Sequence, residues 1–386
     1  MLVRVAAGRA VPFDIIGTFN IRFRENTERR VVFDPSEVLQ GLISYDFEAM
    51  QSDGPWQLAP NSILWYVVGF TSQKLISSVW VDQNTIQADM KCVWNGSIPT
   101  YFFPTYDDDF FVSEQNEPPK PLTEYTPNLT PIGSDDSYWV GFLSKDEQAP
   151  LQFEITKYPL PDLQGTPLTA DPAQGNPFGL SFSGLPSIDG NQFTRPSTRV
   201  GIGPRDLAAI TSPISFTGVQ SYRIRFTSTT TGASTVLDYT FNIKDCSKYP
   251  PTRIHWLNRL GGFDSWTFGM KSNTEEKVDR KQFYQQKNVL SGGSYGYGTM
   301  SRGATDYFVG TSEEITLNTD LLTDADLVHL RGLISSPVVF YESGNNNYAS
   351  VNVVDKSWKQ KRGQQDGTFN LELRIKPSMD EMRQRG

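Results

Sequence analysis

The stretch of sequence that decides the fold is Arg253-Ile-His-Trp-Leu-Asn-Arg-Leu-Gly-Gly-Phe-Asp-Ser-Trp-Thr-Phe268. Aromatic and aliphatic residues that favour strands lie on both sides of Gly261-Gly262. A Gly-Gly pair between two such runs is typical of the tight turn of a β-hairpin. The stretch has neither the residue types nor the spacing of a catalytic motif. It therefore favours a protein that assembles over one that catalyses a reaction.

The rest of the chain repeats this strand-rich character. Residues 18–24 alternate apolar and polar side chains, and 220–227 with 235–243 predict a second hairpin. Among 31 glycines and 25 prolines, one longer helix is predicted at 324–334, with Thr323 and Asp326 as its capping box. A short helix is predicted at 34–41, capped by Asp34 and ended by a left-handed Gly41. We expect a mainly β protein with several antiparallel β-sandwich or barrel-like modules, one or two short helices and long Pro/Gly-rich extended arms.

Composition shifts predict the domain organisation. Pro250-Pro251 marks one boundary, and runs of proline mark the arms. The predicted parts are an N-terminal β module at 1–94, a Pro-rich arm at 95–135, a central β module at 136–245 with an extended loop at 158–215, and a C-terminal β module with one helix at 246–386. Within them, we expect a turn at Asp82-Gln-Asn84 between two strands, and a polar, flexible segment at 271–310.

Charge and hydropathy exclude several classes of protein. The net charge of −8 argues against a general nucleic-acid binder, which needs a cationic surface. Residues 1–245 hold 17 basic and 27 acidic residues, whereas 246–386 hold 18 and 16. This asymmetry suits copies that stack acidic face to basic face, although ordinary surface variation would also produce it. The longest apolar block, Ile63–Phe70, is too short to span a membrane, and we expect no signal peptide.

Candidate catalytic and metal-binding residues are sparse. The only histidines, His255 and His329, lie within a predicted strand and a predicted helix, and the two cysteines, Cys92 and Cys246, form no CxxC pair. The acidic runs Asp107–Asp109 and Asp135-Asp136 lack the spacing of a calcium loop. We therefore expect no catalytic residues, no cofactor-binding site and no metal site, and the chain is not expected to be an enzyme. Its two thiols are expected to be buried and reduced.

Two further patterns have a structural and a binding interpretation. The basic run Lys356–Arg362 surrounds Trp358 between two predicted strands, so it predicts a solvated hairpin tip or a salt-bridging contact, with nucleic-acid binding as the alternative. The eight tryptophans mostly lie in strand patterns, which favours the core or a subunit interface over a carbohydrate cleft.

Several segments together resemble a family of virion structural proteins from tailed phages of Bacteroidetes-type hosts, including crAss-like phages. The main match is Cys246-Ser-Lys-Tyr249 followed by Ile254–Phe268. Weaker pieces follow the same order along the chain: Phe33–Phe47, Leu317–Asp324 and Ser336–Glu342. The resemblance covers the first fifty residues and most of 246–386, but not the middle of the chain. It implies a ring or connector component of a phage neck or tail, with no catalytic residues to carry over.

The sequence therefore predicts a cyclic homo-oligomeric ring in the virion, assembled in the host cytoplasm, whose partners are portal, neighbouring ring and tail proteins. No cofactor and no membrane contact are expected, and nucleic acid is not expected as a partner. A receptor- or glycan-binding tail module is the alternative, and a glycan-cleaving enzyme with paired carboxylates is a third possibility. The candidate interface residues are Trp256, Asn258, Arg259, Phe263, Trp266, Trp358 and Lys359.

Overall fold

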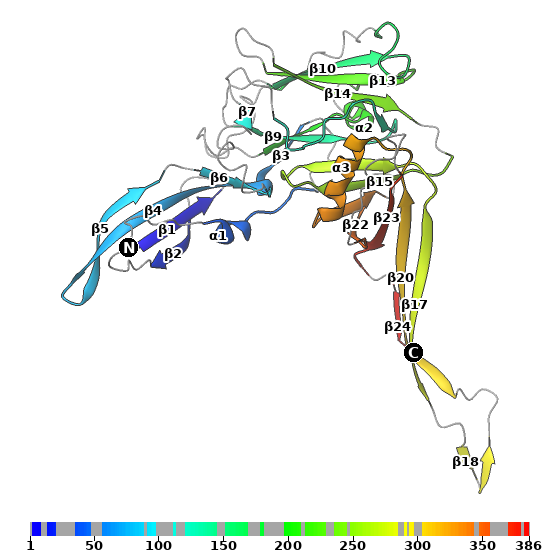
Figure 1. Ribbon diagram of the computed structural model, residues 1–386. Helices are drawn as coiled ribbons and strands as arrows, with labels where there is room; N and C mark the ends of the chain where they lie inside the picture. Colours follow the sequence, from blue (N-terminus) through cyan, green and yellow to red (C-terminus); the bar gives the residue numbers. More distant parts are fainter. Residues whose placement is uncertain are drawn as a thin grey trace. The chain divides into compact units, whose positions relative to one another are not determined.

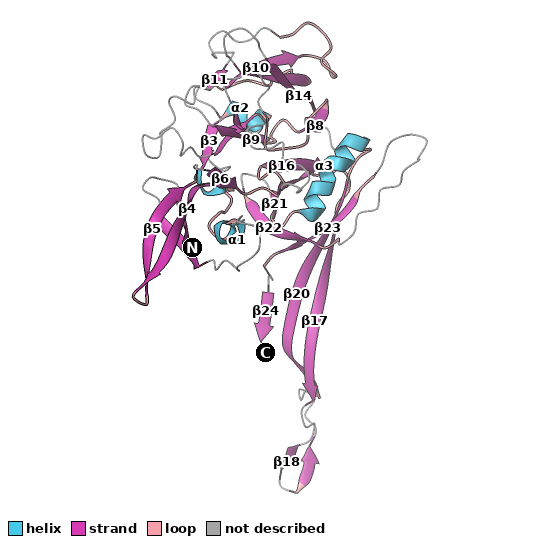
Figure 2. Ribbon diagram, turned by 60° about the vertical axis from the view of Figure 1, so that its left-hand side comes forward, coloured by secondary structure: helices cyan, strands magenta, loops and turns pink. Residues whose placement is uncertain are grey.

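The structure is a computed structural model of the chain, and strands dominate the part that it describes (Figure 2). The expectation of a mainly β protein with several antiparallel sheets is confirmed. The described residues are 2–8, 14–20, 35–47, 56–88, 91–97, 111–112, 120–144, 151–168, 178–180, 197–209, 213–228, 235–244, 248–284, 289–291, 293–296, 303–342, 347–355, 370–379 and 382–385.

The chain divides into two compact units. Unit 1 contains Met1–Asp245 together with Leu257–Ser265, and unit 2 contains Cys246–Trp256 together with Trp266–Gly386. The predicted hairpin around Gly261-Gly262 is present as β15 (Thr252–Leu257) and β16 (Phe263–Phe268). Its turn therefore belongs to unit 1, whereas most of its two strands belong to unit 2.

Two packed sheets form a β-sandwich in unit 1. One sheet has the order β11-β10-β13-β14-β8, and the other has the order β3-β12-β9-β7. Side chains from both sheets form one apolar core, which includes Phe142, Phe153, Val200, Tyr222 and Phe241. The strands are β3 (Trp56–Ala59), β7 (Phe111–Val112), β8 (Thr130–Ile132), β9 (Trp139–Ser144), β10 (Leu151–Tyr158), β11 (Phe178–Leu180), β12 (Ser197–Gly201), β13 (Ser221–Ser228) and β14 (Thr235–Ile243).

A third sheet of unit 1 has the order β2-β1-β4-β5, and β6 also pairs with β4. Its strands are β1 (Leu2–Gly8), β2 (Asp14–Asn20), β4 (Ile63–Ile76), β5 (Val79–Gln87) and β6 (Lys91–Trp94). The turn expected at 82–84 is wrong, because these residues lie inside β5. The chain instead turns at Ser77-Ser78, where both residues have positive φ, as a two-residue hairpin turn of the primed type requires.

Two expectations for the helices and loops of unit 1 need correction. Helix α1 (Ser36–Gln40) has Pro35 as its N-cap without a side-chain hydrogen bond, and Gly41 ends it with φ −67°, not in a left-handed conformation; Asp34 lies outside the described residues. The loop expected at 158–215 contains the fully buried strand β12 and the helix α2 (Pro204–Ala208). A short 3-10 helix, Pro60–Ser62, precedes β4.

Unit 2 is built on a sheet with the order β16-β15-β21-β22-β23-β20-β17, to which β24 is added beside β20. The remaining strands are β17 (Asn273–Tyr284), β18 (Val289–Ser291), β19 (Ser294–Gly296), β20 (Ala304–Asn318), β21 (Val339–Glu342), β22 (Tyr348–Val353), β23 (Glu372–Pro377) and β24 (Met382–Arg385). Helix α3 (Asp324–Ser335) begins at Thr323, and its capping box with Asp326 is confirmed. The helix buries Leu327, Leu330 and Leu333.

The segment expected to be flexible at 271–310 contains one of the longest regular features of the chain. Strands β17 and β20 pair in antiparallel register from Asn273 to Tyr284, and they form an extended ribbon (Figure 1). Polar side chains hold the ribbon together across its strands, including the ion pairs Lys277–Glu314 and Arg280–Asp306. The polar composition of Asn273–Tyr284 therefore reflects an exposed ribbon, whereas residues 285–288, 292 and 297–302 lie outside the described part of the chain.

Candidate functional site

The turn of the 252–268 hairpin is fixed by one buried amide side chain. Nδ2 of Asn258 donates to the carbonyl oxygen of Leu122 at 2.8 Å, and Oδ1 accepts from the backbone N–H groups of Leu260 and Gly262 at 2.9 and 3.1 Å. Gly261 has φ +87°, and a Cβ there would overlap the carbonyl oxygen of Asn95. Glycine is thus required at this position both by the backbone conformation and by the close approach of a second segment.

The hairpin turn also completes part of the apolar core of unit 1. Leu260 packs in a cluster with Ile63, Trp65, Leu122 and Leu143. Its carbonyl oxygen accepts a hydrogen bond from Nε1 of Trp94 at 3.2 Å. The sequence motif with the clearest family resemblance therefore provides packing and backbone hydrogen bonds within the chain.

A buried carboxyl group lies next to this turn. Burial raises the pKa of Asp264 to about 7, although hydrogen bonds from Thr123 and Asn258 act in the opposite direction. Asp206, the other strongly shifted carboxyl group among the described residues, has its pKa raised to about 7 by burial, against hydrogen bonds from Ser137, Tyr138 and Gly203. Both groups are enclosed by protein, so their shifts describe folding stability more directly than contact with a substrate.

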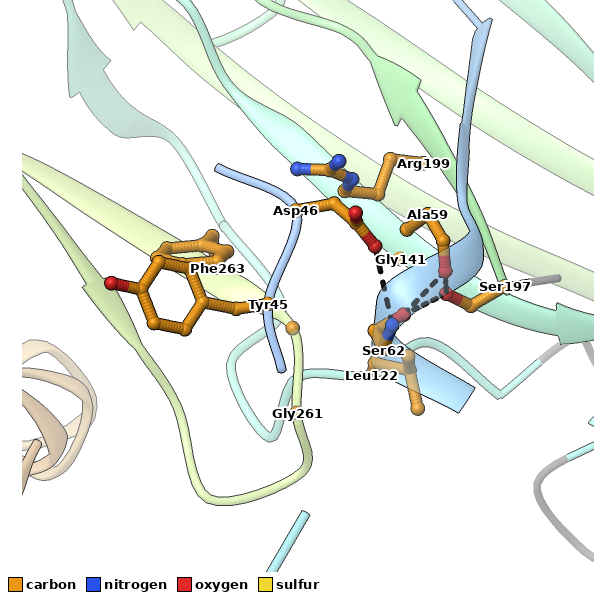
Figure 3. A pocket seen from close by; sticks show the side chains of 11 residues that line it. Tyr45, Asp46, Ala59, Ser62, Leu122, Gly141, Ser197, Arg199, Gly261 and Phe263 are labelled. Carbon is orange, nitrogen blue, oxygen red and sulfur yellow. Dashed lines mark hydrogen bonds between the residues drawn. The ribbon is translucent and has the colours of Figure 1, made fainter. Parts of the chain in front are cut away.

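A small pocket of unit 1 lies beside the hairpin turn (Figure 3). On one side, Tyr45 and Phe263 meet edge to face with ring centroids 6.0 Å apart. On the other side, the carboxylate of Asp46 accepts from the backbone N–H groups of Asn61 at 2.8 Å and Ser62 at 3.2 Å. The pocket has room for about a single water molecule. The full lining is Tyr45, Asp46, Ala59, Ser62, Leu122, Gly141, Ser197, Arg199, Gly261, Gly262 and Phe263.

Arg199 is the unusual member of this pocket. Arg199 lies on the buried strand β12 and is only 5% exposed. None of its guanidinium nitrogens donates a hydrogen bond to any described residue. Burial lowers the pKa of Arg199 to about 10, while the negative charge of Asp46 acts in the opposite direction. The side chain therefore stays protonated at neutral pH, and its charge is compensated through space by Asp46 without a direct hydrogen bond.

The serine hydroxyl groups of the pocket bond to each other and to the backbone. The hydroxyl groups of Ser62 and Ser197 are hydrogen-bonded to each other, and their oxygens lie 2.7 and 3.1 Å from the carbonyl oxygen of Ala59. One hydroxyl group therefore donates to the other, which in turn donates to Ala59. A nucleophilic serine needs an adjacent base, and the described residues that line this pocket include no histidine. The geometry instead ties the segment around Asp46 to the short helix before β4 and to β12.

The two histidines lie in the interior of unit 2. His255 is fully buried, and its Nε2 lies 3.0 Å from Oε2 of Glu342. His329 of α3 packs between Trp256 and Trp266, with ring centroids 4.8 and 6.1 Å away. Both rings are thus surrounded by side chains of their own unit.

The structure places the candidate interface residues in different environments. Trp256, Asn258, Phe263 and Trp266 are buried within the chain itself. Arg259 is exposed and forms an ion pair with Glu124. Trp358 and Lys359 lie outside the described residues. The structure brings Asn258 and Phe263 together at the hairpin turn, and their role in a contact between molecules stays a prediction.

Exposed apolar side chains instead gather on two hairpins that the sequence did not single out. On the β4–β5 hairpin, Leu75 pairs with Trp80 and Ile76 pairs with Val79, and Trp80 is 61% exposed. On the β17–β20 ribbon, Phe283 and Tyr307 have ring centroids 6.2 Å apart, and neighbouring Tyr284 is 83% exposed. Alternating strand patterns mark such residues as half-buried, and only the structure shows that nothing in the described chain covers them.

Three further findings concern metal ions, membrane-spanning helices and similar proteins. Within the described residues, which do not include Asp107–Asp109, no cluster of three or more His, Cys, Asp or Glu side chains could hold a metal ion. No helix in the described part of the chain is long and apolar enough to cross a membrane. Comparisons with protein-family models, with curated proteins and with solved structures found no match in any of the three.

Proposed function

We propose that the protein is a virion structural protein, a ring or connector component of a phage neck or tail that assembles as a cyclic homo-oligomer. The observation that carries this proposal is the exposed apolar surface of the β4–β5 and β17–β20 hairpins. Large aromatic side chains stabilise a protein chiefly when they are buried, and Trp80 and Tyr284 are not buried by their own chain. Contact with other protein molecules would bury them.

The β17–β20 ribbon supports this proposal through its geometry. Every residue of β17 is exposed, and in the described part of the chain the ribbon from Gln282 to Tyr284 consists of β17 and β20 alone, beyond the last pair with β24. A two-stranded ribbon without a packed face is marginally stable in water. A neighbouring molecule that packs against Phe283, Tyr284 and Tyr307 would supply the missing face.

The resemblance to virion structural proteins agrees with what the motif residues do. Asn258, Leu260 and Gly261 form and pack the hairpin turn, and the buried hydroxyl groups of Ser62 and Ser197 bond to each other and to a backbone carbonyl oxygen. These contacts support a structural role. We propose that the partners are further copies of the chain and portal, neighbouring ring and tail proteins, and that the protein is located in the virion.

The proposal is tested by the mass and shape of the purified protein in solution. Native mass spectrometry and cryo-electron microscopy of the full chain should show a closed ring. Replacing Phe283 and Tyr284 together by serine should weaken assembly or stacking, whereas Val236→Ser, an exposed apolar position of β14, should not. A chain that stays monomeric at all concentrations and does not occur in particles would refute the proposal. Binding to a glycan that Trp80→Ala abolishes would favour the receptor- or glycan-binding alternative.

A further inference from the structure

We propose that copies of the chain join by β-sheet addition, with strand β5 of one copy pairing with strand β2 of the next, so that their sheets continue around a closed ring. This inference rests on the proposed homo-oligomer and names the surface that would join its copies. The two strands lie at opposite ends of the path β2-β1-β4-β5 (Figure 1).

Both edges lack lysine and proline, two of the features that usually prevent strand addition, although each strand has one register irregularity, opposite Val5–Ala6 in β2 and opposite Thr71–Gln73 in β5. Exposed edge strands present unpaired backbone N–H and C=O groups, and monomeric proteins protect them with lysine, proline or a covering segment. Strand β5 contains no proline and no lysine, and all nine of its residues are exposed. Its single charged residue, Asp82, already pairs with Arg4 at 3.2 Å. Strand β2 contains no proline and only one charged residue, Asp14.

One row of cross-strand partners has an apolar side chain on each of the two edge strands. Val3 of β1 pairs with Phe19 of β2 and with Phe70 of β4, and Phe70 pairs with Ile86 of β5. Because cross-strand neighbours share a face, Phe19 and Ile86 stand at the two ends of one row on the face where Val3 is fully buried. Ile86 is 70% exposed. Joining β5 to β2 of another copy would extend this row and cover Ile86.

The strand directions allow this joining to repeat. Each of the three pairings β2–β1, β1–β4 and β4–β5 is antiparallel. Strand β5 therefore runs antiparallel to β2 of its own copy, and also to β2 of a neighbour related by rotation about a ring axis. Every junction would then be an antiparallel pairing of two strands. Such a contact uses two different edges, which is the head-to-tail arrangement of a closed ring.

The test uses one variant for each edge. Ile86→Glu places a charge on the β5 edge, and Ile15→Glu does the same on the β2 edge, where Ile15 is 63% exposed. Val236→Glu is the control, because Val236 is an exposed apolar residue of β14, which belongs to a different sheet of unit 1. Each edge variant should lose the ring and sediment as a monomer, whereas the control should form rings like the unmodified chain.

Mixing the two edge variants gives the decisive result. One intact β5 edge and one intact β2 edge then remain, so the mixture should form dimers of twice the monomer mass and nothing larger. The inference is overturned if Ile15→Glu still forms rings or dimers alone, or if the mixture stays monomeric. Val79→Glu and Thr18→Glu form a second pair, should circular dichroism show that either first variant is unfolded. A monomeric unmodified chain would instead refute the proposed oligomer itself.

Discussion

Replacing Asn258 by alanine tests whether its buried amide group holds the turn of the 252–268 hairpin. Nδ2 is the donor to the carbonyl oxygen of Leu122, and Oδ1 is the acceptor for the N–H groups of Leu260 and Gly262. Alanine removes these three hydrogen bonds, and it also removes the hydrogen bond from Asn258 to Asp264. It leaves these backbone groups in a region where the residue at 258 is only 8% exposed.

The expected cost follows from these three bonds. A typical hydrogen bond contributes about 0.5–1.5 kcal/mol net, so three bonds give about 1.5–4.5 kcal/mol. Backbone groups left buried without a partner move the cost toward the upper end of this range. We expect a loss of about 3 kcal/mol, a large share of the stability of a typical protein.

Hydrogen exchange measured at increasing urea concentration gives the free energy of opening for peptides that cover the turn and residues 120–125. Arg259→Ala is the matched control in the same turn, because the ion pair of Arg259 with Glu124 is about half exposed on both sides and such pairs contribute less than about 1 kcal/mol. Equal losses in the two variants, or a loss below about 0.5 kcal/mol for Asn258→Ala, would show that the amide group does not hold the turn.

Three further predictions follow from buried or capping groups. Because the pKa of Asp264 is raised to about 7, the unfolded chain releases this proton first, so the free energy of unfolding should fall as the pH rises from about 4 to about 7. Urea titrations across this range should show a smaller fall for Asp264→Asn; an unchanged fall would contradict the assignment. Arg199→Met should leave the melting temperature unchanged or raise it, because it removes a buried cation without a hydrogen-bond partner in the described chain. A loss of more than about 2 kcal/mol in the free energy of unfolding would refute this prediction. Thr323→Ala should destabilise α3 by about 1 kcal/mol in thermal unfolding, whereas Thr323→Ser, which keeps the hydroxyl group, should not.

The features that the sequence predicted depend on neighbouring residues. The turn at Gly261-Gly262 needs a positive φ that glycine supplies, and the α3 capping box lies within four residues, Thr323 to Asp326. Strands β13 and β14 carry regular alternation up to their hairpin turn. In each of these elements, the local conformational preference and the burial pattern indicate the same structure, so a short stretch of sequence is sufficient to predict it.

The features that the sequence missed depend on distant contacts. Ser77-Ser78 forms the β4–β5 turn without glycine or asparagine, because the strong pairing of the two strands imposes the conformation. Strand β12 follows a Pro/Gly-rich stretch and becomes a strand because β3 and β9 pair on both of its sides. Strand β17 is too polar to be recognised by an apolar pattern, and its register with β20 is visible only in three dimensions.

The candidate site also combines features that the sequence predicts with features that depend on distant contacts. Trp256 and Trp266 were candidates for a contact between molecules because their sequence context predicts burial, but a strand pattern does not distinguish burial within a chain from burial between chains. The pocket around Arg199 joins residues from three distant parts of the chain, Asp46, Arg199 and Phe263, and no local spacing indicates it. The exposed residues of β5 could be identified only after the sheet order placed that strand at an edge.

The 252–268 hairpin, whose turn belongs to unit 1 and whose strands belong mostly to unit 2, affects when unit 1 can finish folding during protein synthesis. Leu260 completes an apolar cluster whose other members, such as Ile63 and Leu143, leave the ribosome much earlier. The first unit therefore cannot fill its interior as soon as residue 245 has emerged, and it must wait for the segment 257–265. In a nascent chain or recombinant fragment that stops at Asp245, Trp65 and Leu122 would lack Leu260, against which they pack in the full chain. Such a fragment should depend on chaperones to stay in solution.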